Sequence, residues 1–172
     1  MNADQAKFLA DHYAQIIEGE IPTTRKVLAA VGEGDGEYKP DPKSRSAIQL
    51  ARHIATSDVW FIQSILDGKF DFDPAAAEKA EAQLGTAEQA AAFYENAMRE
   101  KIAALRAAPT SQLTREVDFF GMMKGPAAGF LAFAQNHSVH HRGQLAAYLR
   151  ASGSKVPSIY GGSADEPFVA TT

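Results

Sequence analysis

Apolar residues recur every three or four positions through four long stretches of this chain, which is the spacing of one face of an α-helix. The first stretch predicts a helix over residues 4–18. Gly19 and Pro22 are expected to interrupt it, with a shorter continuation as far as Val31. Three glycines between residues 32 and 36 then end the helical pattern, and a loop follows.

The second and third stretches carry recognisable helix ends. The second helix is expected to begin near Asp41 or Ser44, where an aspartate precedes a proline, and to end at about Leu66. The third follows Thr86–Gln89, a capping box in which the first and last side chains satisfy each other's backbone N–H groups. It is expected to end near Ala108, just before a proline.

The fourth helix is expected to open at Gly125-Pro126 and to run to about Ala151, with a glycine just past its end. Residues 67–85 and 110–124 form long connections, and the second of these contains a short extended piece at Val117, Phe119 and Phe120. We find no convincing pair of strands. The predicted fold class is therefore all-α, a four-helix bundle with long crossover connections rather than simple up-and-down order.

Composition excludes several classes of function. The 172 residues suffice for one domain, expected to span 1–172, and the absence of cysteine removes disulfides, thiolate metal sites and a cysteine nucleophile. A net charge of −4 without a basic, aromatic-rich patch argues against nucleic acid as a partner. Neither a signal peptide nor a run of ~18 apolar residues is present, so we expect a cytoplasmic protein without a membrane partner.

Three of the five histidines lie within the segment 136–144, inside the fourth predicted helix. His137 and His141 are four residues apart, so their side chains share one face. With Phe130 as the reference, helix geometry places these two at about −20° and about +20°, the centre of the expected core stripe, and His140 about 80° away. The pattern therefore predicts an inward pair, with His140 outside it.

Two interpretations of the inward pair remain open. Both imidazoles could be core side chains held by hydrogen bonds, or both could bind one metal ion. A zinc site usually needs three or four ligands, and His53 on the second helix is the candidate third. Its face also carries several serines, so His53 lies either on the surface or beside a polar cavity.

Three further side chains have alternative roles in this region. Gln144 could orient an imidazole by a hydrogen bond or could link two helices. Arg142 is expected on the far side from His137, in a surface or interface salt bridge. Trp60, about 20° from the His53 direction, either packs in the core or forms a pocket wall. No zinc-protease, di-iron or phosphate-loop motif is present in the sequence.

The motif His137-x-x-x-His141-Arg142-Gly143-Gln144, with Leu50-Ala51-Arg52-His53-Ile54-Ala55 upstream, resembles the DinB/YfiT superfamily of metalloenzymes. The tail from Gly153 through Pro157 and Tyr160 to Asp165, and Pro40 to Ser44, are similar to one branch of it. The resemblance implies a bundle of non-sequential helix order, often a homodimer, with a divalent metal held by His53, His137 and His141. Members with known activity include thiol-dependent S-transferases and an isomerase that uses a low-molecular-weight thiol.

We therefore expect a metal-dependent thiol S-transferase or hydrolase acting on a small-molecule electrophile. The resemblance implies that the three histidines bind zinc, or alternatively nickel or iron, and that a low-molecular-weight thiol or water is the nucleophile. The alternative is a non-catalytic metal-binding or stress-related dimerisation module, which a fourth inward ligand such as Asp58 or Gln49 would favour. A carrier of a small apolar ligand in the bundle core is a third option.

Overall fold

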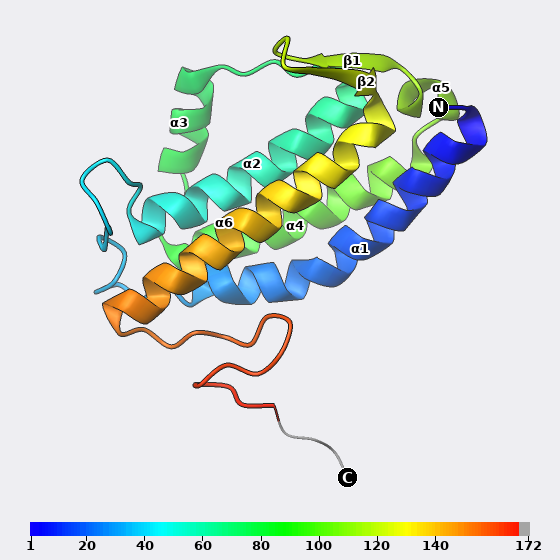
Figure 1. Ribbon diagram of the computed structural model, residues 1–172. Helices are drawn as coiled ribbons and strands as arrows, with labels where there is room; N and C mark the ends of the chain where they lie inside the picture. The colour runs from blue at the N-terminus through cyan, green and yellow to red at the C-terminus, as the bar shows by residue number, and fades with distance from the viewer. Residues whose placement is uncertain (169–172) are drawn as a thin grey trace.

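The computed structural model describes residues 1–168 and is a bundle of four long helices (Figure 1). These are α1 (Ala3–Ala29), α2 (Ala47–Asp67), α4 (Ala87–Ala107) and α6 (Leu131–Ser152). α1 and α2 each pack chiefly against α4 and α6 rather than against each other. Helices that follow one another, α1 with α2 and α4 with α6, thus lie diagonally across the bundle. This arrangement confirms the predicted all-α bundle with crossover connections.

The crossovers are the loop 30–46 and the segment 108–130, because each joins two diagonal helices. The connection 67–85 was a candidate crossover from the sequence, but it joins α2 to α4, which are neighbours. Bundle topology therefore brings α2 and α6 side by side, although a complete helix separates them in the sequence (Figure 1).

α1 continues through Gly19 and Pro22, so the predicted interruption is wrong. Proline removes one backbone hydrogen bond and commonly costs about 3 kcal/mol inside a helix. Beyond Gly19, α1 continues to bury the same face as its first half, through Ile21, Thr24 and Val27. Tertiary burial along the whole helix offsets the local cost.

Two helices begin later than predicted. α2 begins at Ala47, because Ser46 caps it and forms a capping box with Gln49. A 3₁₀ turn, η1 (Ala127–Phe130), precedes α6. The Thr86 capping box of α4 is confirmed. The left-handed glycine just past α6 is confirmed as well, with Gly153 at φ 88°.

The connections contain structure that periodicity did not reveal. α3 (Pro74–Ala82) is capped by Asp73 and has no buried residue, which explains why no apolar stripe marked it. α5 (Thr110–Leu113) is one short turn. β1 (Glu116–Phe119) and β2 (Met123–Pro126) form an antiparallel hairpin, so the expectation of no strand pair is wrong. Phe120 lies in its turn with φ 52° rather than in the extended piece.

The core forms between the inward faces of the four long helices. Ala6, Ala10 and Ala14 are fully buried at four-residue spacing on α1, whose most extensive contacts are with α4. Such small side chains allow two helix backbones to approach closely. Within residues 1–168, no helix combines the length and apolarity that crossing a membrane requires.

Candidate metal centre

His53 from α2 meets His137 and His141 from α6 where the two helices pack together. One ring nitrogen of each histidine lies within 4.8 Å of the others, and we call these three residues the histidine triad. Ring centroids are 4.5 Å apart for His137 and His141, and 4.9 Å apart for His53 and His141. His140 is exposed, as the helix geometry predicted.

The triad lies at the edge of the buried face of α6 rather than at its centre. The side chains of His137 and His53 are 16% and 19% exposed. The centre of the buried face holds Ser138, Arg142 and Leu145 instead. The sequence analysis took Phe130 as the centre of the buried face. That predicted centre lies about 70° around the helix from the observed one. An edge position suits a functional site, because an edge can be reached from outside the core.

Each histidine of the triad uses Nδ1 in a hydrogen bond to the protein. His137 Nδ1 lies 3.2 Å from Asp58 Oδ1, and His141 Nδ1 lies 3.0 Å from Gln144 Oε1. A carboxylate or an amide oxygen can only accept, so Nδ1 of each ring donates. Gln144 is thus an orienting partner within α6, one of the two roles predicted for it, and its Nε2 donates to Tyr148.

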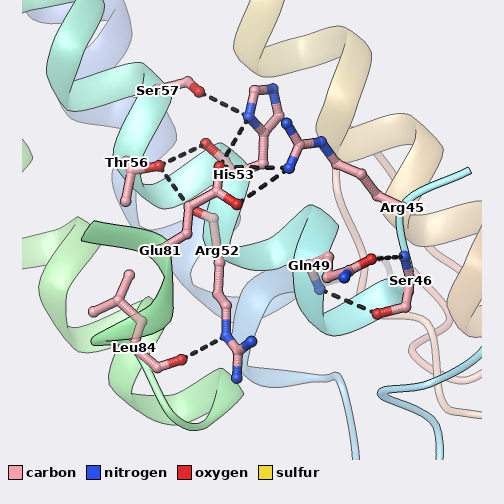
Figure 2. A network of polar contacts seen from close by, with 9 residues as sticks. All are labelled: Arg45, Ser46, Gln49, Arg52, His53, Thr56, Ser57, Glu81 and Leu84. Carbon is pink, nitrogen blue, oxygen red and sulfur yellow. Dashed lines mark hydrogen bonds and ion pairs between the residues drawn. The ribbon is translucent and has the colours of Figure 1, made fainter. Parts of the chain in front are cut away.

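His53 is held in the same way by partners from two helices (Figure 2). Its Nδ1 lies 3.0 Å from Ser57 Oγ and 3.5 Å from Glu81 Oε1, and Glu81 also pairs with Arg45 at 3.1 Å. Partial burial acts to raise the pKa of Glu81, but hydrogen bonding to His53 and the charge of Arg45 hold it below its usual value. An ionised Glu81 favours the tautomer of His53 with its proton on Nδ1, which leaves Nε2 unprotonated.

The surroundings of His141 favour its neutral form. Burial, the largest cause, together with the neighbouring His137 and His53, lowers the pKa of His141 to about 4 against the opposing effect of the Gln144 hydrogen bond. At neutral pH His141 is therefore uncharged. Neutral imidazole is the form that binds metals, and a hydrogen bond at one ring nitrogen directs the other toward the ion.

Asp58 provides a second sign that the site fits a cation. Its side chain is 3% exposed, and Oδ2 has no hydrogen-bond partner within residues 1–168. Leaving such an acceptor buried and unsatisfied costs about 1–3 kcal/mol, which a nearby positive charge would offset. Because Oδ1 of Asp58 contacts Nδ1 of His137, the aspartate orients that ring rather than joining the triad. Gln49 is committed to the α2 cap, so neither proposed fourth ligand joins the triad.

A groove of about 760 Å³ runs between α2 and α3 and includes His53 in its wall. Trp60 lines it and also packs against the core, so both predicted alternatives describe this side chain. Trp60 contacts the ring of Phe72 as well, at a centroid distance of 5.6 Å. The groove therefore borders the triad at His53, while His137 and His141 do not line it.

Arg142 is placed differently from its predicted surface position. It is 1% exposed and pairs with Glu20 of α1 at 2.5 Å, while its Nη1 donates to Thr24 at 2.9 Å. The tail residue Tyr160 lies over it, with its ring 5.0 Å from the guanidinium, and its hydroxyl contacts Glu20 at 3.3 Å. We call Arg142, Glu20, Thr24 and Tyr160 the Arg142 cluster.

Sequence reasoning missed Ser57 and Glu81 as partners of His53. Ser57 follows His53 by four residues, and that helical spacing was a usable signal. Glu81 gave no such signal, because it belongs to α3, which no apolar stripe marked. Asp58 lies 79 residues before His137, and only the fold brings the two together.

Comparison with known proteins identifies relatives of the same size. The DinB family model matches residues 1–167. The uncharacterized protein YjoA of Bacillus subtilis is 29% identical over 132 residues, which are 76% of this chain and 82% of YjoA. The crystal structure of YjoA, a DinB-like protein, superposes with a TM-score of 0.64 at 25% identity, covering 91% of this chain and 96% of YjoA.

Two further solved structures share the fold. A DinB-like protein from Bacillus cereus gives a TM-score of 0.68 at 26% identity, over 87% of this chain and 97% of the other. YfiT from Bacillus subtilis gives 0.66 at 18% identity, over 85% and 89%. YfiT is described as a probable metal-dependent hydrolase with an unusual four-helix bundle topology.

Proposed function

This chain belongs to the DinB family, and on that premise we propose that it is a metal-dependent enzyme. His53, His137 and His141 hold a divalent ion, zinc being the expected one, through Nε2 of each ring. The observation that carries this proposal is that every ring of the triad uses Nδ1 in a hydrogen bond, which leaves Nε2 available, while one ring nitrogen of each histidine lies within 4.8 Å of the others.

Three protein ligands distinguish a catalytic site from a structural one, which usually has four. Within the described part of the chain, the only group of histidine, aspartate and glutamate side chains with metal-ligand spacing is the triad. Bound by three neutral imidazoles, a divalent ion would keep its full charge and an open position, and would supply the acidification of a bound water or thiol.

The residues around the triad fix it in place. Asp58 and Gln144 hold the tautomers and ring planes of His137 and His141, and Ser57 with Glu81 does so for His53. Such partners make a ligand more basic and reduce the freedom that binding would otherwise remove. Since the chain has no cysteine, a thiol nucleophile must come from a small cosubstrate, whereas a hydrolase needs only water.

We favour hydrolysis or thiol transfer with a small electrophilic substrate. The description of YfiT as a probable metal-dependent hydrolase supports hydrolysis. The groove beside His53 has the size of a small-molecule site. Donor chemistry alone accepts zinc, nickel or iron, so the ion is identified by reconstitution with each.

Metal analysis of purified protein tests this proposal. We expect about one equivalent of divalent ion in the native protein and almost none in the double variant His137→Ala/His141→Ala. His140→Ala is the matched control, because it removes an exposed histidine from the same helix and should keep the ion. Equal metal content in the native protein and the double variant would contradict the proposal.

A further inference from the structure

The groove between α2 and α3 is long and has distinct ends. On α2 its wall runs from Gln49 to Trp60, a helical distance of about 16 Å. α3 forms the opposite wall with small alanine side chains and Glu81. His53 lies between the two ends, so an extended molecule in the groove would pass this one residue of the histidine triad.

One end of the groove is electropositive. Lys43 and Arg45 line it, and they lie next to the N-terminus of α2, whose first turn contains no acidic residue. Helix N-termini carry partial positive charge and favour anions. Arg45 is paired with Glu81, whereas Lys43 makes no ion pair within residues 1–168. This end therefore suits a carboxylate, with Lys43 as its main partner.

The other end is aromatic and acidic. Trp60 and Phe72 line it with their rings 5.6 Å apart, and Phe72 is 51% exposed. Their exposed ring surface favours an apolar group, since covering it removes apolar area from water. Asp71 and Asp73 also border this end, and their like charge would repel a carboxylate from it. Glu78, one turn before Glu81 on α3, adds a negative charge between this end and His53.

The middle of the groove is polar but not strongly charged. Thr56 and Ser57 line it beside His53, and the charge of Glu81 is balanced by Arg45. Hydroxyl groups in such a position suit a neutral, hydrogen-bonding linkage. The groove is therefore divided into three zones that match an acid, a polar linkage and an apolar tail.

We propose that this groove binds an extended organic acid of the N-acyl amino acid type. The carboxylate lies at Lys43, the amide passes His53, and the acyl chain lies on Trp60 and Phe72. The proposal rests on the proposed function only in that the amide lies beside His53, which that function assigns as a metal ligand. Binding in the groove does not itself depend on a metal ion.

Fluorescence of Trp60, the single tryptophan, reports occupancy directly. The metal-free protein is titrated with N-octanoylglycine, with its neutral amide N-octanoylglycinamide, and with N-acetylglycine. We expect saturable binding of the first, affinity about fivefold lower for the amide through loss of one partly exposed charge contact, and affinity at least about tenfold lower for the acetyl compound. Equal affinity for acid and amide, or no saturable change with either, would overturn the proposal.

Two pairs of variants locate the ligand. Lys43→Gln should weaken the acid about fivefold and leave the amide unchanged, while Lys79→Gln, on α3 outside the groove, should change neither. Phe72→Ala should weaken both octanoyl compounds, and the exposed Phe8→Ala on α1 should weaken neither. If Lys43→Gln and Phe72→Ala both bind the acid as tightly as the native protein, the proposal is also overturned. Since metal is absent throughout, groove binding without any metal binding would overturn the proposed function and leave this inference standing.

Discussion

α6 presents two polar clusters to two different neighbours. Toward α2 it holds the histidine triad, in which three groups of the same kind face one another. Toward α1 it holds the Arg142 cluster, in which a buried cation meets the carboxylate of Glu20. His141 and Arg142 are adjacent in the sequence, yet one is half-buried and the other is fully enclosed.

The two clusters differ in whether their buried polar groups find all their partners within the chain. Arg142 finds an opposite charge, a hydroxyl and an aromatic ring within the chain, so it needs nothing from outside. The triad offers acceptor nitrogens to one another and an unsatisfied Asp58 oxygen behind them. Hydrogen-bond acceptors cannot satisfy one another. This is the physical reason to assign function to the histidine triad and stability to the Arg142 cluster.

The largest expected effect is on stability, from Arg142→Ala. Removing the guanidinium leaves Glu20 with an uncompensated charge beside the core, and we expect the free energy of unfolding to fall by about 3 kcal/mol. Urea denaturation measures the change. The control Arg99→Ala breaks an exposed pair with Glu95 and should cost only about 0.4 kcal/mol. A similar loss for both arginines would remove the distinction between the clusters.

The next effect concerns metal-linked stability of the triad. Zinc at 100 times its dissociation constant should stabilise the native protein by about 2.7 kcal/mol, because only the folded chain assembles the site. Thermal unfolding with and without zinc measures this shift. The shift should vanish in His137→Ala/His141→Ala and persist in Arg142→Ala at a temperature where that variant is folded. Zinc stabilisation of the double variant would break the comparison.

A smaller effect is expected from Asp58→Asn, which keeps the shape but removes the charge next to His137. The amide of the asparagine can turn its nitrogen toward Nδ1 of His137. Because that nitrogen cannot accept a hydrogen bond, part of the orienting contact is lost. We expect metal affinity to fall about 10- to 100-fold in a competition titration with a chelator. Asp67→Asn, at the exposed end of α2, is the matched control and should leave the affinity unchanged.

pH dependence of the metal-free protein sharpens the comparison further. The pKa of His141 is about 4 in the folded chain, against an ordinary value of 6.5, so the unfolded chain binds more protons between these values. Unfolding free energy should therefore fall as the pH drops through that window. His141 is only half-buried, so we expect about 1 kcal/mol rather than the full conversion of the shift. His141→Ala should flatten the slope, and His140→Ala should keep it.

The smallest effect is expected from Tyr160→Phe in the Arg142 cluster. This change removes the hydroxyl that contacts Arg142 and Glu20 but keeps the ring over the guanidinium. We expect a loss of about 0.5 kcal/mol in urea denaturation, because the tyrosine is largely exposed. A loss as large as that of Arg142→Ala would mean that the tail, rather than Glu20, holds the arginine.

Sequence reasoning was most successful where a local signal exists. The capping box at Thr86 and the glycine at 153 depend on neighbours a few residues away, and both were predicted correctly. The convergence of His53 with the α6 pair was anticipated mainly through family resemblance. Arg142 was placed on the outside of α6 because the core face was centred on Phe130, about 70° from its true centre, and its partner Glu20 is far away in the sequence. The cytoplasmic location and the homodimer stay predictions.

The limits of periodicity show in α6 and α3. In α6, alanine, glutamine and histidine blur the apolar stripe, so the reference face was chosen wrongly by most of a quarter turn. In α3 no residue is buried, so no apolar stripe marked the helix, and its one local signal was the cap Asp73 followed by a proline. Residues to which we assign function thus fall where the apolar signal is weakest, because such a site needs polar groups at partly open positions.

The diagonal connections of the bundle set an order of events in time. Asp58 and His137 are 79 residues apart, and α4 must be made before α6 can reach α2. Such distant contacts form late, since closing a long segment costs entropy before any contact repays it. During synthesis, therefore, His53 cannot meet His137 and His141 until α6 leaves the ribosome. Under the proposed function, the chain could bind its metal ion only after α6 packs against α2, so metal binding would mark completion of the fold.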